Sequence, residues 1–249
     1  MVNQTSKEKI RLDILLVQKG LAESREKAKA MIMAGEVEIN GLKADKPGHS
    51  IPFSSDISVK KVSPAYVSRG GLKLESALDH FSINVNNLTL MDVGASTGGF
   101  TDCLLKRGAK KIFAVDVGYG QLHWDLRQDP RVIVMERTNA RYLTPDDIKE
   151  DINGAVVDVS FISLKHIIPS LSKLLLDKAF IVALIKPQFE AGREQVGKGG
   201  VVRDTSVHDA VVRELGVFFN KQGWNVAGHI PSPILGPKGN REFLIYLRR

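Results

Sequence analysis

The chain has 249 residues, enough for one or two domains, and its 43% hydrophobic and 25% charged content argues against a largely disordered chain. Its 35 lysines and arginines outnumber its 28 acidic residues, and the net charge of +7 favours a polyanionic partner. The single cysteine, Cys103, excludes an internal disulfide and a thiolate-rich metal site, which favours a reducing cytoplasm.

The first sixty residues predict a small domain of their own. Leucines at helical spacing indicate a first helix that ends at Gly20. Ser24 is placed to cap a second helix over residues 25–33. Apolar and polar residues then alternate over 36–40 ahead of an Asn-Gly turn, and residues 57–59 could pair back with this strand. We therefore expect two short helices followed by a small hairpin sheet.

The segment from Arg11 to Val59 resembles the RNA-binding module named after the fourth protein of the small ribosomal subunit. The strongest part is the run SREKAKAMIMAGEVEINGLKA, in which a basic helix ends at a glycine and leads into a strand and turn. In that family the helix and the following turn contact structured RNA. The resemblance implies RNA contacts by Arg25, Lys27, Lys29 and Lys43, whereas spacing alone favours a solvated helix face.

Residues 60–87 predict a bridge, and we expect the domain boundary between Lys60 and Tyr66. Gly70 and Gly71 predict a bend, after which a helix is expected over residues 72–81. The predicted organisation is therefore an RNA-binding domain over 1–60, a linker and first helix over 61–87, and a larger domain over 88–249.

From Leu88 onward, apolar strands alternate with helices, a pattern typical of a parallel sheet covered on both faces. The expected strands are residues 88–93, 112–115, 132–135, 155–159 and 180–185. The expected helices are residues 100–107, 164–176 and 207–221. Two final strands, 226–230 and 243–247, have no helix between them and should form an antiparallel hairpin. The predicted fold class is α/β, a parallel sheet with an antiparallel last strand, preceded by a small α+β domain.

The run DVGASTGGF, from Asp92 to Phe100, leaves the first strand, turns on glycines and opens a helix. Nucleotide-like ligands bind at this position in open α/β sheets, and glycines let the backbone approach the ligand. Asp116 ends the second strand 22 residues after Gly94, close to the spacing expected of a carboxylate that holds a ribose. The glycine spacing differs from the dinucleotide pattern and no P-loop lysine follows, so S-adenosylmethionine fits better than NAD.

A second loop, after the third strand, lies where an adenine contact is expected, although its Thr and Asn also suit an ordinary capped turn. The glycines of the first loop could likewise serve only a tight turn. The candidate cofactor contacts are Asp92, Gly94, Ala95, Ser96, Gly98, Gly99, Phe100, Asp116, Thr138, Asn139 and Asp158.

Polar residues stand at the ends of three apolar strands. Asp158 and Lys186 close the fourth and fifth strands, and Glu242 opens the last one. The carboxyl ends of parallel strands share one crevice, and an antiparallel last strand begins at the same edge. Lys73 could enter from the preceding helix. Each residue alone could be a helix cap or a solvated charge, but two lysines and two carboxylates together predict a catalytic site.

The chain from Ser68 onward resembles the FtsJ-like ribose 2′-O-methyltransferases. The runs that carry this resemblance are SRGGLKLESAL, MDVGASTGGFTDCLL, VVDVSFISL, ALIKPQFE and GNREFLIYL. The Lys-Asp-Lys-Glu tetrad of that family matches Lys73, Asp158, Lys186 and Glu242 in chain order. With the RNA-binding module in front, the chain resembles the TlyA-type, haemolysin A-like rRNA cytidine-2′-O-methyltransferases. The resemblance implies a Rossmann-like methyltransferase fold, S-adenosylmethionine as methyl donor, and ribosomal RNA or ribosomal subunits as substrate.

The residue types suit that chemistry, because a ribose hydroxyl must lose or share its proton as it attacks a methyl group. Lysine accepts a proton only in its neutral form, which desolvation and a neighbouring cation favour. Lys186 is the candidate base, and Lys73 is the neighbouring cation, which could also stabilise the developing alkoxide. Asp158 and Glu242 are expected to orient the two lysines. Arg69, beside the predicted bend, is a further candidate RNA contact.

Other chemistries fit the sequence less well. Carbon methylation needs a cysteine nucleophile, but Cys103 falls in the helix after the glycine loop, where a packing role is favoured. Methylation of an exocyclic amine would favour an Asn/Asp-Pro-Pro-aromatic run, and residues 158–161 read DVSF instead. The six histidines lack ligand-like spacing, so no metal is expected.

Two other functions stay open at this stage. The chain could be a non-catalytic RNA-binding or ribosome-assembly factor, although the glycine loop and the tetrad argue against this. It could also be a membrane-active haemolysin, but the N-terminus is polar and no run approaches the ~18–20 apolar residues of a spanning helix. We therefore expect a cytoplasmic protein. The basic, glycine-containing loop 189–202 could close over RNA or simply connect two elements.

Overall fold

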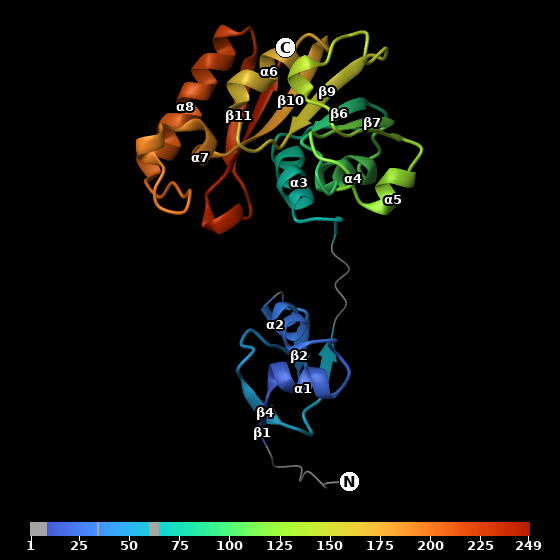
Figure 1. Cartoon of the computed structure of the whole chain (residues 1–249), viewed down its shortest axis with the longest axis vertical. Helices are drawn as coiled ribbons and strands as arrows, with labels where there is room; N and C mark the ends of the chain where they lie inside the picture. Colours follow the sequence, from blue (N-terminus) through green and yellow to red (C-terminus); the bar gives the residue numbers. More distant parts are fainter. Residues whose placement is uncertain (1–8, 34, 60–64) are drawn as a thin grey trace. The chain divides into compact units, whose positions relative to one another are not determined.

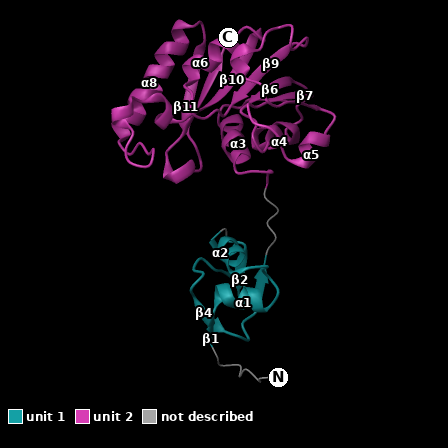
Figure 2. Ribbon diagram, in the orientation of Figure 1, with its two compact units in different colours: residues 1–64 teal, residues 65–249 magenta. Residues whose placement is uncertain are grey.

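The computed structural model describes residues 9–33, 35–59 and 65–249. The chain divides into two compact units, residues 1–64 and residues 65–249 (Figure 2). The polar N-terminal residues 1–8 and most of the predicted domain boundary, residues 60–64, lie outside the described residues.

The first unit contains the two predicted helices and the predicted hairpin sheet. Its helices are α1 (Leu12–Gln18) and α2 (Arg25–Met33). Its strands are β1 (Lys9–Arg11), β2 (Val37–Ile39), β3 (Leu42–Lys43), β4 (Ser50–Pro52) and β5 (Ile57–Val59). Strand β2 pairs with both β3 and β5, so the predicted return of residues 57–59 is confirmed. The β1–β4 pair was not predicted, because strands of three residues give too short a pattern.

The apolar pattern of the first unit forms one small core. Leu12, Leu15 and Leu16 of α1 are fully buried against Ile32 of α2. Ser24 caps α2, with its hydroxyl accepting a hydrogen bond from the backbone N–H of Lys27 at 3.2 Å. The short helices are thus held by packing and by a cap, as isolated helices of this length are marginal in water.

The second unit is built on a seven-stranded sheet with the order β11-β12-β10-β9-β6-β7-β8. The strands are β6 (Thr89–Val93), β7 (Lys111–Val115), β8 (Val132–Met135), β9 (Ile152–Val157), β10 (Leu175–Ile185), β11 (Asn225–Pro231) and β12 (Phe243–Arg248). Strands β6 to β10 run parallel to one another, and β12 is antiparallel to both β10 and β11. The predicted fold class and the terminal hairpin are therefore confirmed.

Helices cover both faces of this sheet, as Figure 1 shows. Strand side chains alternate between the faces, so that Met91 and Val93 of β6 pack on one side and Leu90 on the other. The first face carries α6 (Leu164–Leu171) and α8 (Thr205–Lys221), and the second carries α3 (Gly70–His80), α4 (Gly99–Lys106) and α5 (Trp124–Gln128). Burial on both faces explains why the parallel strands are continuously apolar.

Helix α3 begins at Gly70, two residues before the predicted start, so the predicted bend at Gly70 and Gly71 is wrong. These glycines allow a close approach between helices: a Cβ on Gly71 would collide with the ring of Tyr66. A Cβ on Gly99, at the start of α4, would lie 2.9 Å from the backbone nitrogen of Gly71. The helix that carries Lys73 is therefore packed within the second unit.

Helix α6 ends at Leu171, five residues before the predicted end. It contains Pro169, which lacks the N–H that an internal helical position donates. The apolar residues that follow belong to β10, where Leu175 pairs with Ile152 of β9 ahead of an irregularity that ends at Phe180. A short apolar run fits a buried helix and a buried strand equally well, which explains the error.

Candidate active site

The glycine loop connects β6 to α4 and lies directly against the end of β9. Gly94 and Gly98 have φ values of +86° and +96°, the left-handed region that favours glycine. A Cβ on Gly94 would collide with the carbonyl oxygen of Asp158. The loop therefore needs glycine for its backbone conformation and for its contact with the neighbouring strand end.

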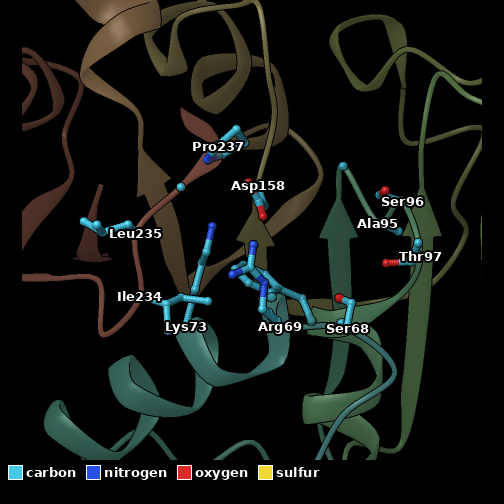
Figure 3. Close-up of a pocket in the computed structure, with 15 residues that line it drawn as sticks. Ser68, Arg69, Lys73, Ala95, Ser96, Thr97, Asp158, Ile234, Leu235 and Pro237 are labelled. Atoms are coloured by element: carbon cyan, nitrogen blue, oxygen red, sulfur yellow. The ribbon is translucent and has the colours of Figure 1, made fainter. Parts of the chain in front are cut away.

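Two cavities flank this loop, and both are lined by Gly94, Ser96 and Asp158. One has a volume of about 380 Å³, and its further lining includes Val115, Asp116, Val117, Gln121, Thr138 and Asn139. The other has a volume of about 400 Å³, and its further lining includes Arg69, Lys73, Ala95, Gly99, Phe100 and Gly236 (Figure 3). Of the predicted cofactor contacts, Asp92 and Gly98 line neither of these two cavities.

Asp116 joins the loops that follow β6 and β7. Its Oδ2 accepts a hydrogen bond from the backbone N–H of Ser96 at 2.8 Å, and its Oδ1 accepts one from Gly118 at 2.7 Å. Its backbone carbonyl accepts from the N–H of Thr138 at 2.9 Å. Asn139 caps the short helix η1 (Ala140–Tyr142), so the loop after β8 is a capped turn that also lines the first cavity.

Asp92 lies beneath the glycine loop and is fully enclosed. Its Oδ2 accepts a hydrogen bond from the Thr101 hydroxyl at 2.6 Å, whereas its Oδ1 has no hydrogen-bond partner among the described residues. Burial raises the pKa of Asp92 to about 7, although the Thr101 hydrogen bond opposes the shift and the nearby Asp158 adds to it.

Strand register brings the tetrad residues to one edge of the sheet. Strands β9 and β10 are parallel neighbours, and Asp158 and Lys186 directly follow their last residues. In the antiparallel pair of β10 and β12, Ile185 lies opposite Phe243, so Glu242 precedes β12 at the same edge. Sheet topology thus gathers side chains from three separate strand ends at one edge.

The four residues form two ion pairs. Lys73 Nζ lies 2.6 Å from Glu242 Oε2, with both side chains buried. Lys186 Nζ lies 2.7 Å from Asp158 Oδ1 and donates a hydrogen bond to the Ser160 hydroxyl at 2.8 Å. In Figure 3 the amino group of Lys73 and the side chain of Arg69 extend toward the end of β9, where Asp158 lies. Each lysine is therefore held by a carboxylate at the cavity wall.

Phe161 is a feature of the site that the sequence patterns did not reveal. Its side chain is 89% exposed and its φ is +64°, a strained conformation for a bulky residue. Its ring lies 4.9 Å from that of Phe189, centroid to centroid. Hydrophobic periodicity carries no signal for a positive φ, so only the presence of an aromatic residue shortly after the strand end could have drawn attention to it.

A third cavity, of about 350 Å³, lies on the other side of Phe161. Its lining is Ser160, Phe161, Lys186, Gln188, Phe189, Gly199, Gly200, Pro237, Lys238 and Asn240. One wall comes from the basic, glycine-containing loop 189–202. The buried amide of Asn240 anchors this loop, accepting from Val202 N–H at 3.1 Å and donating to the Gly200 carbonyl at 3.0 Å. Lys238 donates to the Gly199 carbonyl at 2.9 Å.

Cys103 is buried in α4, and burial raises the pKa of its thiol to about 11. A thiol in this state packs as a small apolar group and is a poor nucleophile. Within the described ranges, no group of three or more His, Cys, Asp or Glu residues could hold a metal ion.

The predicted RNA contacts of the first unit fall into two kinds. Lys27, Lys29 and Lys43 are exposed. Arg25 instead shares the buried carboxylate of Asp13 with Arg11, at 3.2 Å and 3.0 Å respectively. The hydrogen bonds from Arg11 are the main reason that the pKa of Asp13 falls to about 2. Arg25 thus has a structural contact, while the three lysines leave their charges toward solvent.

Comparison with known proteins identifies both units. Residues 66–249 match the family of FtsJ-like methyltransferases, and residues 10–57 match the S4 domain. The chain is 48% identical over 239 residues to the 16S/23S rRNA (cytidine-2′-O)-methyltransferase TlyA of Mycobacterium tuberculosis, an alignment that covers 96% of this chain and 89% of the relative.

Two solved structures extend the comparison. One is named "Putative hemolysin from Streptococcus thermophilus"; it has a TM-score of 0.75 and 49% identity, and the match covers 97% of this chain and 89% of that one. A SAM-dependent methyltransferase from Aquifex aeolicus shares the fold alone, with a TM-score of 0.51 and 16% identity over 73% of this chain and 93% of its own.

The haemolysin name raises the question of a membrane span. No helix in the part of the chain that the structure describes is both long and apolar enough to cross a bilayer. The matched domains and the relatives agree instead with the α/β sheet and its glycine loop. The chain belongs to the FtsJ-like methyltransferase family, as a TlyA-type member in which an S4 domain precedes the methyltransferase domain.

Proposed function

We propose that this methyltransferase transfers a methyl group from S-adenosylmethionine to a ribose 2′-hydroxyl of ribosomal RNA, at a cytidine. The observation that carries the proposal is the arrangement of two lysine–carboxylate pairs, one buried and one half-buried, beside the glycine loop. The named activity of the Mycobacterium tuberculosis relative supports the same reaction and the same nucleotide.

The residues around the glycine loop fit S-adenosylmethionine. The cavity of about 380 Å³ combines apolar walls from Val115 and Val117 with the carboxylate of Asp116, which suits a nucleoside with a ribose. Gly94 lines this cavity, and no lysine or arginine is among its lining residues to hold a phosphate. When bound there, S-adenosylmethionine supplies an activated methyl group.

The tetrad residues would then prepare the ribose hydroxyl for attack. In its neutral form Lys186 would take the proton from the 2′-hydroxyl as the hydroxyl oxygen bonds to the methyl carbon and the carbon–sulfur bond of the donor breaks, leaving a thioether; this role is worth about 10²–10⁴ in rate. Asp158 and Ser160 hold its Nζ in place. Lys73, held by Glu242, stabilises the negative charge that develops on the oxygen. The carboxylates act by positioning the lysines, since an anion favours the charged form of a neighbouring lysine.

The first unit and the site surroundings would bind the RNA. Exposed Lys27, Lys29 and Lys43 suit phosphate contacts, and Arg69 lies beside the tetrad at the cavity wall. The exposed ring of Phe161 suits stacking on an unpaired base, which is how proteins recognise single-stranded RNA positions. Stacking there would place the attached ribose near Lys186.

The test is transfer of labelled methyl from S-adenosylmethionine to ribosomal subunits by the wild type and by Lys186→Ala. The matched control is Lys165→Ala, which removes a partly exposed lysine of α6 paired loosely with Glu214. We expect label at one alkali-resistant nucleotide for the wild type and the control, and at least a 100-fold slower transfer for Lys186→Ala. Equal rates for all three would remove Lys186 from the mechanism, and no label with any subunit would overturn the proposed function.

A further inference from the structure

The side chain of Gln188 carries a hydrogen-bond acceptor without a partner, and Gln188 lies beside Lys186 at a cavity wall. Gln188 lines this cavity of about 350 Å³ together with Lys186 and Phe161. Its Oε1 is buried and has no hydrogen-bond partner among the described residues. Buried polar atoms are nearly always paired, so an unpaired one on a residue that lines a cavity next to reactive groups points to a hydrogen bond that forms when a ligand enters.

We propose that Gln188 selects the target nucleotide by accepting a hydrogen bond from the exocyclic amine of its base, which for cytosine is N4. This inference rests on the proposed function, because it assigns the base that accompanies the methylated ribose. It assigns to Gln188 a role in specificity, separate from the proton transfer at Lys186.

The backbone holds Gln188 at a fixed position relative to Lys186. Both flank Pro187, the first residue of the short helix α7 (Pro187–Glu190). At the other end of α7, the Glu190 carboxylate accepts from the Ser163 hydroxyl at 2.6 Å and from the Leu164 N–H at 2.8 Å. Helix α7 is thus tied to the start of α6, which holds the backbone that carries Gln188 beside Lys186.

Because Lys186 and Gln188 line the same cavity, one nucleotide bound there can contact both side chains. If the ribose oxygen lies at Lys186, the attached base extends into the same cavity, where Phe161 offers a ring face and Gln188 offers an acceptor. Aromatic contact is tolerant of base identity, because every base has a π-face. The polar group therefore carries the discrimination.

The chemistry of the pyrimidine edges makes this discrimination sharp. Cytosine presents an N4 amine as a donor, whereas uracil presents the O4 carbonyl at the same position. With uracil, two acceptors would face each other in a buried site and neither would regain its bond to water. Sites that hydrogen-bond a substrate group reject analogues that lack it much more strongly than apolar pockets do.

Two variants separate recognition from structure. Gln188→Met keeps the length of the side chain and removes the acceptor, whereas Gln188→Glu keeps an acceptor. The matched control is Gln128→Met, in the exposed part of α5. The substrates are ribosomal subunits whose methylated nucleotide is either the native cytidine or a uridine, and the readouts are kcat/KM for each and the dissociation constant of S-adenosylmethionine.

We expect the wild type to prefer cytidine over uridine by about 10- to 100-fold, the range for one unfilled buried hydrogen bond. Gln188→Met should lose a similar factor on cytidine and little on uridine, so the preference collapses while cofactor affinity is unchanged. Gln188→Glu and Gln128→Met should keep the preference.

Three results would overturn the inference. One is equal use of cytidine and uridine by the wild type, and another is an equal loss on both substrates in Gln188→Met. The third is a methylated nucleotide whose base lacks an exocyclic amine. A wild type that methylates no subunit at all would instead overturn the proposed function, and the inference with it.

Discussion

The Lys73–Glu242 pair is the most strongly buried charge interaction of the candidate site. Both side chains are almost excluded from solvent, and Glu242 Oε1 has no hydrogen-bond partner among the described residues. Buried pairs gain little over apolar packing, but breaking one leaves an uncompensated charge. The pair is therefore costly to disrupt, which makes its contribution measurable separately from catalysis.

We expect Glu242→Gln to lower the free energy of unfolding by about 3 kcal/mol, because it leaves the Lys73 ammonium buried without a counter-charge. The measurement is urea denaturation. The control is Glu150→Gln, whose partner Lys111 is 31% exposed and which should cost less than about 1 kcal/mol. Adding Lys73→Met should recover part of the loss, and equal costs for Glu242→Gln and Glu150→Gln would contradict this account.

The raised pKa of Asp92 gives the stability of the ligand-free protein a specific pH dependence. Between about pH 4 and pH 7 the folded protein keeps the Asp92 proton and the unfolded chain releases it. The folded state then binds more protons, so the free energy of unfolding falls as pH rises through this range and the Asp92 contribution levels off above about 7.

Asp92→Asn should remove this contribution, because the amide can still accept from Thr101 but does not ionise. We expect the loss of stability between pH 5 and pH 8 to be smaller in Asp92→Asn than in the wild type, measured by chemical denaturation at several pH values. Asp125→Asn, an exposed position in α5, is the control and should follow the wild type. Identical profiles for all three would show that Asp92 does not titrate as described.

At the level of elements, the glycine loop requires glycine for two reasons, its backbone conformation and its contact with the end of a strand. Gly94 needs a positive φ and also faces the carbonyl of Asp158, whereas Gly120 needs a positive φ and meets no described atom within 4 Å of an added Cβ. These two positions therefore separate conformational strain from steric contact.

We expect Gly94→Ala to weaken S-adenosylmethionine binding at least tenfold, because the glycine loop must move away from Asp158 to make room for the alanine side chain. Gly120→Ala should cost only about 1 kcal/mol of stability, the penalty for a left-handed residue, and should keep cofactor binding. Titration calorimetry and denaturation measure the two effects. Equal binding losses in both variants would mean that the contact with Asp158 has no special role.

The boundaries of the elements show where sequence patterns lose resolution. Apolar runs that alternate with helical patterns predicted the strands and helices in chain order, because burial on both faces of the sheet leaves each strand continuously apolar. The same runs could not separate the end of α6 from the start of β10, where Leu175 pairs with Ile152 only in the folded sheet. The glycines at the start of α3 were wrongly predicted to form a bend, because local composition does not reveal the close helix contact that they allow.

At the scale of the whole molecule, the basic charge is divided between two compact units. If Lys27, Lys29 and Lys43 bind RNA phosphates, their effect should depend on salt, because phosphate contacts release counterions. Cofactor binding in the second unit should not depend on them.

We expect the triple variant Lys27→Ala/Lys29→Ala/Lys43→Ala to bind ribosomal subunits more weakly and to reduce the salt slope of log affinity by about 2 to 3. The control is the triple variant Lys110→Ala/Lys149→Ala/Lys178→Ala, which removes the same charge from exposed positions in the second unit. These positions lie near the beginnings of strands β7, β9 and β10, whereas the candidate site lies at the other ends of β9 and β10. Filter binding at several salt concentrations gives both slopes. An equal change in the two variants would indicate a general charge effect rather than a site.

The amino-acid sequence by itself determined the class of the fold, the order of its elements and the residue types available at the strand ends. These features are local or periodic, because the need to bury strand and helix faces sets the pattern of apolar residues along the chain. The positions of Asp158 and Lys186 after two apolar strands belong to this group.

Only the tertiary structure decided which of these residues meet. Lys73 and Glu242 are 169 positions apart, and they pair because α3 packs on the sheet and β12 runs antiparallel beside β10. The positive φ of Phe161 and the unpaired oxygen of Gln188 likewise became visible only in the folded structure. A periodic pattern specifies which face a residue takes, but the partner across that face is set by strand order and packing, which no local pattern encodes.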